Sequence, residues 1–493
     1  MTCLFGLSPL FSLSYTMLFN SFPFAVFCLA VFLFYFTCPH RFRWLVLLVA
    51  SYVFYMWWRW EFAFLLLSQT AVNYFGARMI HGEVVASRRK AWLVAAVAAN
   101  LGILGFFKYT GFLAGGLQQA LSFVGHPAGF SIPQIILPLG ISFFTFQALS
   151  YVIDVYHGKI PVERHFGRFA LYMSYFPHLM AGPILRASLV IHQFHRDNNF
   201  EIARLVSGLK LALWGLFKKV VIADRLAIYV NNVYGNCHVH TGSSLLLATV
   251  FFAFQIYCDF SGYSDIAIGT SRALGYDIAQ NFNLPYFARS ISDFWRRWHI
   301  SLSTWFRDYV FIPMGGSRVT AVRWAINILV LFSLSGLWHG AKITFVLWGA
   351  LHAIYYLLEK YLGPPFSRMA AALRIRGSLL EAVQMIVTFV MVLIGWVFFR
   401  ADSIRDALYV VRRVVLDPIG PLFQGDSQLT LLLSFVFIAI LLAVQILQHK
   451  GLVSLYSSPA RLPAWLRWTG YLAMILAIAT FGISNNEFIY FQF

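Results

Sequence analysis

DFSGYSDIAIG (residues 259–269), SDFWRRWHISLSTWFRDY (residues 292–309) and LSGLWHG (residues 334–340) belong to one polar interval, residues 259–353, inside an otherwise apolar chain. His299, His339 and His352 lie in this interval, among tryptophans and apolar residues. A neutral imidazole can accept a proton near physiological pH, and burial favours the neutral ring. The interval therefore predicts a site suited to general-base chemistry.

The composition sets the environment of the chain. Of the 493 residues, 60% are hydrophobic and 11% are charged, and the mean hydropathy is +0.70. Soluble domains are roughly 45–50% apolar and about 25% charged. These values exclude an ordinary soluble domain and predict an all-α polytopic membrane protein, embedded in a lipid bilayer.

The charge of the chain is strongly positive. The net charge is +18, from 37 Lys and Arg against 19 Asp and Glu. The basic residues cluster in short loops between apolar runs, which is typical of topology control and contact with anionic headgroups, so no nucleic-acid partner is expected. The basic loops at residues 41–43 and 78–90 predict that both face the cytoplasm and that the N-terminus faces outward.

Apolar runs predict about eleven to thirteen hydrophobic elements. The clearest are residues 22–37, 44–57, 62–77, 91–107, 205–222, 244–257, 322–337, 343–358, 380–399, 431–447 and 468–483. Between residues 108 and 186 the runs are short and interrupted by Pro and Gly, which predicts re-entrant or interfacial backbone around an internal cavity. Residues 259–323 are expected to hold amphipathic interfacial helices and no ordinary crossing.

The beginning of the chain differs from the rest. Residues 1–16 contain no Lys or Arg and no complete apolar span, so they do not have the basic start of a secretory signal. We expect residues 1–16 to be a non-native or disordered leader and residues 17–493 to form a single domain.

The five cysteines are scattered and predict no disulfide framework. Cys237, His238 and His240 are close in sequence, but a fourth ligand at the usual spacing is missing and the surrounding loop contains Gly and Asn. We therefore interpret this segment as an ordinary polar loop and expect no metal.

Seven longer segments of the chain form a set of motifs in a fixed order: PLGISFFTFQALSYVIDVY (138–156), FKKVVIADRLA (217–227), YCDFSGYSDIAIG (257–269), SDFWRRWHISLSTWFRDYVFIPMGGSR (292–318), GLWHG (336–340), GWVFFRADS (395–403) and FIYFQF (488–493). Together they resemble the membrane-bound O-acyltransferase family, and more narrowly its bacterial alginate O-acetylase branch. The resemblance implies helices around a central funnel or tunnel. It also implies that acetyl passes from cytoplasmic acetyl-CoA toward an extracytoplasmic polysaccharide, across the bacterial inner membrane.

The resemblance assigns catalysis to two histidines. The signature histidine of the family corresponds to His339, which we predict to be the general base, and the second motif histidine corresponds to His299. A structural interpretation competes for both, since a lone histidine in an apolar helix is more often a packing residue. Gly336 and Gly340 flank His339 and permit close approach of a thioester or of another backbone.

The residues around His299 suggest how substrates are held. If this stretch is helical, Trp295, His299 and Ser303 share one face, and His299 orients the acceptor, polarises the thioester carbonyl or binds a backbone group. His352 ranks third among the histidines, because its aromatic neighbours explain it as a packing residue.

The basic residues of the interval have two interpretations, as anchors among lipid headgroups or as ligands for the phosphates of the donor. The candidate substrate-binding residues are Trp295, Arg296, Arg297, Ser303, Arg307, Asp308, Trp338 and His352. Asp259, Asp265 and Asp293 are expected to pair with the arginines, because an unpaired carboxylate near lipid is costly.

Two functions from different classes remain at this point. One is an acyltransferase with acetyl-CoA as donor substrate, no bound cofactor, and an extracytoplasmic acetyltransferase or carrier protein as partner. The other is a transporter or channel, although the matching halves typical of transporters are not visible. The acceptor polymer stays open among alginate, cellulose, another exopolysaccharide and peptidoglycan, as does the choice between a sugar and a partner protein as direct acceptor.

Overall fold

The structure is a computed structural model that describes most of the chain. The described residues are 17–125, 131, 135–180, 182–372 (backbone only for 364–371), 377–423, 425, 427–455, 463–483 and 488–489. Every regular element within these ranges is helical, which confirms the predicted all-α class. The predicted leader, residues 1–16, lies outside the described residues.

The first four helices follow the predicted apolar runs. They are α1 (Phe22–Thr37), α2 (His40–Met56), α3 (Phe62–Gly82) and α4 (Ala86–Phe123). Helix α4 is 38 residues long, so it extends well beyond the predicted run at residues 91–107. Arg89, in the first turn of α4, donates to the backbone oxygen of Tyr156. This contact ties the start of α4 to the end of the next long helix.

The interrupted region contains several short helices. It comprises α5 (Ile141–Tyr156), α6 (Phe166–Ser174), α7 (Phe176–Leu179), α8 (Ala187–Val190) and the 3₁₀ turn η1 (Ile191–His195). Gly140 precedes α5 with a φ of +74°, and a Cβ there would lie 2.2 Å from the carbonyl oxygen of Leu179. Buried side chains satisfy the broken backbone: Ser51 Oγ accepts the Phe176 N–H at 3.1 Å. Protein groups therefore replace the missing helical hydrogen bonds.

A second group of helices crosses the molecule beside this region. It comprises α9 (Ile202–Phe217), the π-helical turn η2 (Lys218–Ala223), α10 (Asp224–Gly235), the 3₁₀ turn η3 (Cys237–Val239) and α11 (Gly242–Ala273). The expectation that residues 259–323 contain no crossing is wrong for the first part, because residues 259–269 continue α11 as a buried helix. The aspartates of that stretch are paired inside the protein, so they do not end the helix.

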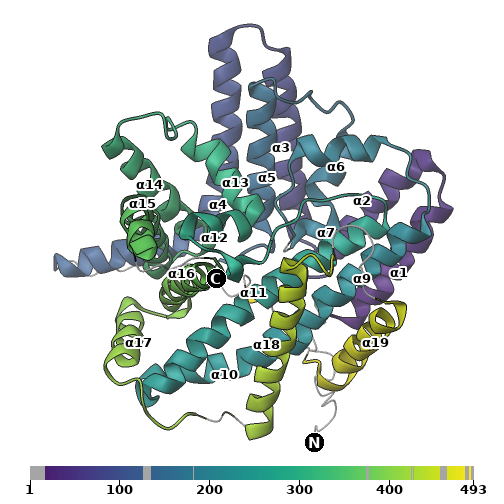
Figure 1. Cartoon of the computed structure of the whole chain (residues 1–493). Coiled ribbons are helices and arrows are strands. Elements are labelled where there is room, and N and C mark those ends of the chain that lie inside the picture. The colour runs from purple at the N-terminus through teal and green to yellow at the C-terminus, as the bar shows by residue number, and fades with distance from the viewer. Residues whose placement is uncertain are drawn as a thin grey trace, which may run out of the picture.

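The polar interval continues through short pieces into long helices. The pieces are η4 (Pro285–Phe287), α12 (Ile291–Arg297), α13 (Ile300–Phe306) and η5 (Arg307–Phe311); α14 (Ala321–His339), α15 (Ile343–Ala372), α16 (Ser378–Arg400), α17 (Ile404–Leu416), α18 (Gln428–His449) and α19 (Ala464–Phe481) follow. In Figure 1, α12 and α13 lie near the middle of the view, with α14 and α15 on one side and α3 and α5 on the other.

Within the described residues, six helices are long and apolar enough to cross a membrane: α4, α11, α14, α16, α18 and α19. Helices α1 and α5 are shorter apolar helices of 16 residues each. The chain is therefore a multi-pass membrane protein, as its composition predicts.

Candidate active site

His339 is the last residue of α14, at the point where α14 crosses α15. A Cβ on Gly336 would lie 2.1 Å from the carbonyl oxygen of Phe345, and one on Gly340 would lie 2.3 Å from the Phe345 ring. The two glycines therefore serve the close approach of another helix, which was one of the two interpretations. Because the crossing leaves no room for larger residues, it fixes the position of the His339 backbone.

His299 lies in the break between α12 and α13, not within one helix. Its φ is +42°, in the left-handed region that non-glycine residues seldom occupy. The prediction that Trp295, His299 and Ser303 share one helical face is therefore wrong. Trp295 packs against His352, with ring centroids 5.1 Å apart, and Ser303 Oγ donates to the Trp298 carbonyl at 3.3 Å.

One asparagine determines the hydrogen-bonding state of His299. Asn281 Oδ1 accepts the backbone N–H of Ser301 at 3.2 Å and its hydroxyl at 2.9 Å. A backbone N–H is always a donor, so it fixes the Asn281 oxygen, rather than the amide nitrogen, at this position. His299 Nδ1 lies 3.2 Å from the same oxygen and must therefore carry a proton.

The state of the opposite ring nitrogen follows. Burial lowers the pKa of His299 to about 3, so the ring is neutral at physiological pH and Nε2 keeps its lone pair. Among the described residues, Nε2 has no hydrogen-bond partner. His299 can therefore accept a hydrogen bond from a substrate hydroxyl or a water, but in this state it cannot donate one to a thioester carbonyl.

The structure brings the two predicted catalytic histidines together. The ring centroids of His299 and His339 are 6.4 Å apart, although the residues lie on different elements. The side chains are almost fully buried, at 0% and 3% exposure. Trp338 touches both rings, with centroid distances of 6.0 Å and 5.0 Å.

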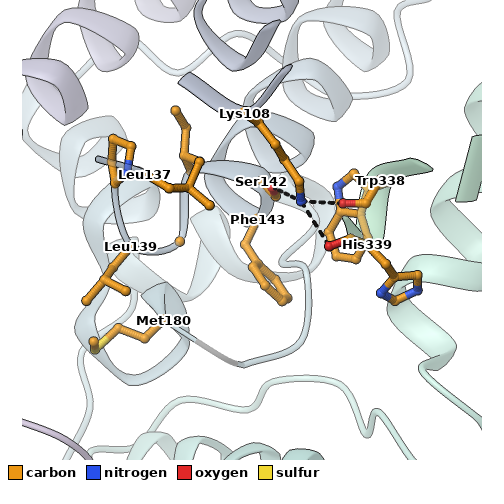
Figure 2. Close-up of a pocket in the computed structure, with 11 residues that line it drawn as sticks. Lys108, Leu137, Leu139, Ser142, Phe143, Met180, Trp338 and His339 are labelled. Carbon is orange, nitrogen blue, oxygen red and sulfur yellow. Dashed lines mark hydrogen bonds between the residues drawn. The ribbon is translucent and has the colours of Figure 1, made fainter. Parts of the chain in front are cut away.

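A small pocket opens beside His339 between α4, the start of α5 and the end of α14 (Figure 2). Its volume is about 60 Å³, well below the roughly 300–1,000 Å³ of most small-molecule sites. It is lined by Lys108, Leu137, Pro138, Leu139, Gly140, Ile141, Ser142, Phe143, Met180, Trp338 and His339. Lys108 supplies its cationic group, and the remaining lining is mainly apolar.

Of the candidate substrate-binding residues, Trp338 alone lines this pocket. His352 is fully buried and is separated from His339 by the ring of Trp348. Trp348 contacts His339 and His352 at centroid distances of 5.2 Å and 5.1 Å. These contacts agree with a packing role for His352.

The arginines of the interval are held in ion pairs or are exposed. Arg297 Nε lies 2.8 Å from Asp293, as predicted for that pair. Arg307 Nε lies 2.7 Å from Asp308, and Arg296 is exposed. None of the three lines the pocket.

The two other aspartates pair with lysines, so the expected arginine pairing is wrong for them. Lys218 Nζ lies 2.8 Å from Asp265, while Lys219 Nζ lies 2.5 Å from Asp259 and 2.7 Å from Asp224. All five side chains are at most 3% exposed. This buried charge cluster also contacts a segment that is distant in sequence, because Asp259 Oδ2 accepts the backbone N–H of residue 489 at 2.7 Å.

The polar loop at Cys237 contacts a carboxylate that is distant in sequence. His238 Nε2 lies 3.0 Å from Asp406 Oδ1, and Cys237 Sγ lies 3.9 Å from the same oxygen. Ser403, the N-cap residue of α17, donates its hydroxyl to Asp406 Oδ2 at 2.6 Å and accepts the backbone N–H of Asp406 at 3.1 Å. These hydrogen bonds account for the three groups as a contact between the loop and α17, while His240 packs on Phe423.

Sequence reasoning missed two residues of the site. Lys108 separates two apolar runs that form one helix, and an ionisable residue inside an apolar helix is itself a signal of function. Asn281 carries no such signal, because only the folded chain shows that an asparagine 18 positions upstream meets His299.

Comparison with known proteins identifies the family. The profile of MBOAT, the membrane-bound O-acyltransferase family, matches residues 160–399. The chain is 41% identical to "Probable alginate O-acetylase AlgI" of Pseudomonas aeruginosa, over 79% of this chain and 73% of that protein. It is 37% identical to the protein of the same name from Pseudomonas putida, over 97% of this chain and 100% of that protein.

A relative with a different acceptor in its name is also similar. The chain is 35% identical to "Peptidoglycan O-acetyltransferase" of Helicobacter pylori, over 76% of this chain and 73% of that protein. These matches favour the acyltransferase over the transporter or channel. The chain belongs to the membrane-bound O-acyltransferase family and is a multi-pass membrane acyltransferase.

Proposed function

We propose that the protein lies in the bacterial inner membrane and transfers acetyl from cytoplasmic acetyl-CoA to an extracytoplasmic polysaccharide. The proposed acceptor is alginate or a similar polymer. The observation that carries the proposal is a pair of neighbouring buried imidazoles, one of which, His339, lines a small pocket. Similarity to proteins named as alginate O-acetylases and as a peptidoglycan O-acetyltransferase supports acetyl as the group and a cell-envelope polymer as the acceptor.

His339 is the general base of the proposed reaction, because it lines the pocket and His299 does not. The acceptor hydroxyl loses its proton to the imidazole as its oxygen attacks the thioester carbonyl carbon. The carbon–sulfur bond then breaks, and the imidazolium returns the proton to the CoA thiolate. The products are an acetyl ester and CoA with a free thiol, and His339 is restored to its neutral state.

In this scheme His299 binds a hydroxyl of the acceptor or a water, and it does not act as the general base. Its Nε2 carries a lone pair, so it accepts a hydrogen bond from a second hydroxyl of the acceptor or from a water. The hydrogen bonds of Asn281 hold the ring in place before substrate arrives, and such preorganisation contributes to catalysis.

The size of the pocket indicates how much of each substrate enters. A volume of about 60 Å³ accommodates an acetyl group, whereas small-molecule sites that enclose a whole ligand reach roughly 300–1,000 Å³. We infer that only the reacting ends meet at His339, with the bulk of the donor on one side of the membrane and the acceptor on the other. The acceptor hydroxyl belongs to the sugar or to an extracytoplasmic carrier or acetyltransferase partner.

The proposal is tested with inverted membrane vesicles from cells that make the polymer, which expose the cytoplasmic face. Labelled acetyl-CoA is added outside, and the label esterified to alginate, cellulose or peptidoglycan is released with mild alkali. We expect alkali-labile label on one polymer when the protein is present, and none in vesicles from a deletion strain. Equal labelling in the deletion strain, or label on no polymer, would contradict the proposal.

A further inference from the structure

We propose that Lys108 is a positioning residue for His339: it holds the end of α14 and thereby sets where the imidazole lies. The Lys108 ammonium donates to the backbone oxygens of Trp338 and His339, at 2.5 Å and 3.2 Å, and to Ser142 Oγ at 3.3 Å (Figure 2). The inference rests on the proposed function for the role of His339, but its geometry stands independently.

The contacts account for every donor on the side chain. A lysine ammonium has three N–H groups, and Lys108 has three acceptors. Among the described residues, no carboxylate lies within ion-pair distance of it. Lys108 is thus engaged with backbone and hydroxyl dipoles, so its role is to hold the protein rather than to bind the donor.

The acceptors are the carbonyl groups that a helix leaves unsatisfied at its end. Near this end of α14, the carbonyl of Gly336 accepts the backbone N–H of Gly340 at 3.4 Å and is the last that accepts a backbone N–H among the described residues. The next carbonyl, of Leu337, accepts the hydroxyl of Tyr109 at 2.9 Å, and the following two accept Lys108. Two adjacent residues of α4 therefore cap three consecutive carbonyls of α14.

The charge of Lys108 suits this position. Aligned peptide dipoles place partial negative charge at a helix C-terminus, where a cation is stabilising. Ser142 lies in the first turn of α5, so one ammonium joins α4, α5 and α14 at the wall of the pocket. Without Lys108, the end of α14 that faces α4 would be held mainly by Tyr109. A displacement of about 1 Å at a reacting group can lower a rate about 10²-fold.

The test is chemical rescue of a truncated side chain. Lys108→Ala should lower kcat for acetyl transfer about 10²-fold, with KM for acetyl-CoA changed less than about twofold, because Lys108 does not bind the donor. Added n-propylammonium should restore kcat at least about tenfold by occupying the space of the lost side chain. Tetramethylammonium, which has the same charge but no N–H donor, should restore nothing.

A matched lysine controls for charge and folding. Lys360 contacts Trp324, near the opposite end of α14, with its Nζ 3.8 Å from the ring centroid. Lys360→Met should leave kcat within about twofold of the wild type, since this lysine of α15 contacts α14 at Trp324 and not at the His339 end. A kcat loss in both variants, or a Lys108→Ala loss that n-propylammonium does not reverse, would overturn the positioning role.

A second readout separates this inference from the proposed function. Amide hydrogen exchange of the peptide covering residues 333–342 reports the order of the α14 end without any substrate. We expect faster exchange in Lys108→Ala and recovery with n-propylammonium, even if the wild type were to use another acyl donor. Unchanged exchange in Lys108→Ala would overturn the inference, whereas wild-type protein inactive with acetyl-CoA would overturn only the proposed function.

Discussion

Asn281 holds His299 through a single side-chain oxygen, which lies 3.2 Å from Nδ1 of the ring and also accepts both donors of Ser301. Asn281→Ala removes the acceptor of three donors, so we expect acetyl transfer to fall close to the level of His299→Ala. Asn281→Asp keeps an acceptor oxygen and should retain more activity than Asn281→Ala. Turnover per folded enzyme measures this, and an Asn281→Ala variant with wild-type turnover would refute the role of Asn281.

The crossing of α14 and α15 should tolerate no added methyl group. A Cβ on Gly336 would lie 2.1 Å from the Phe345 carbonyl oxygen, so Gly336→Ala must push the helices apart and displace His339. We expect strongly reduced transfer together with a lower unfolding temperature. Gly102→Ala is the matched control, because nothing lies within 4 Å of its Cβ position in α4; it should be neutral or stabilising by about 0.5–1 kcal/mol. Equal behaviour of the two variants would contradict the packing argument.

The buried charge cluster should depend on Lys219. Lys219→Met leaves Asp224 and Asp259 without their shared lysine, and breaking a buried ion pair costs about 3–5 kcal/mol. We expect low membrane abundance or a lower unfolding temperature in detergent. Lys210→Met, which removes only a lysine 5.1 Å from the Tyr471 ring centroid, should change stability little. Comparable losses for both variants would show that the cluster has no special weight.

The orientation in the membrane is predicted by the basic loops. A reporter fused after Arg89 should be active in the cytoplasm, and one fused near residue 18 should be active outside. Since Arg89 contacts the end of α5, the same experiment places that end of α5 on the cytoplasmic side. The reverse pattern at both sites would invert the side from which the donor enters.

Much of the fold was predictable because apolar runs of helical length are a strong signal in a membrane protein. The run at residues 22–37 has the same bounds as α1. The prediction failed at residues 259–269, where Asp259 and Asp265 suggested a surface segment. These residues belong to the buried helix α11, and both aspartates pair with lysines of η2. Pairing of this kind depends on residues 40 to 47 positions apart and leaves no periodic pattern in the sequence.

The candidate site was predictable in part. The motifs identified His299 and His339, and the structure places their rings 6.4 Å apart. The residues around His299 were predicted less well. A continuous helix would place Trp295 and Ser303 on the same face as His299, but α12 ends before His299 and α13 begins after it. Non-glycine residues seldom adopt the left-handed backbone conformation, so no helix propensity predicts that break.

The proposed reaction depends most directly on His339. The measurement is kcat for acetyl transfer from acetyl-CoA by purified His339→Ala, at matched folded concentration, beside His299→Ala and His352→Ala. Loss of the general base should lower kcat by about 10²–10⁴-fold, with normal insertion and abundance. His299→Ala should lower it strongly and His352→Ala only mildly. Near-normal turnover by His339→Ala would contradict the account and make His299 the first candidate for the base.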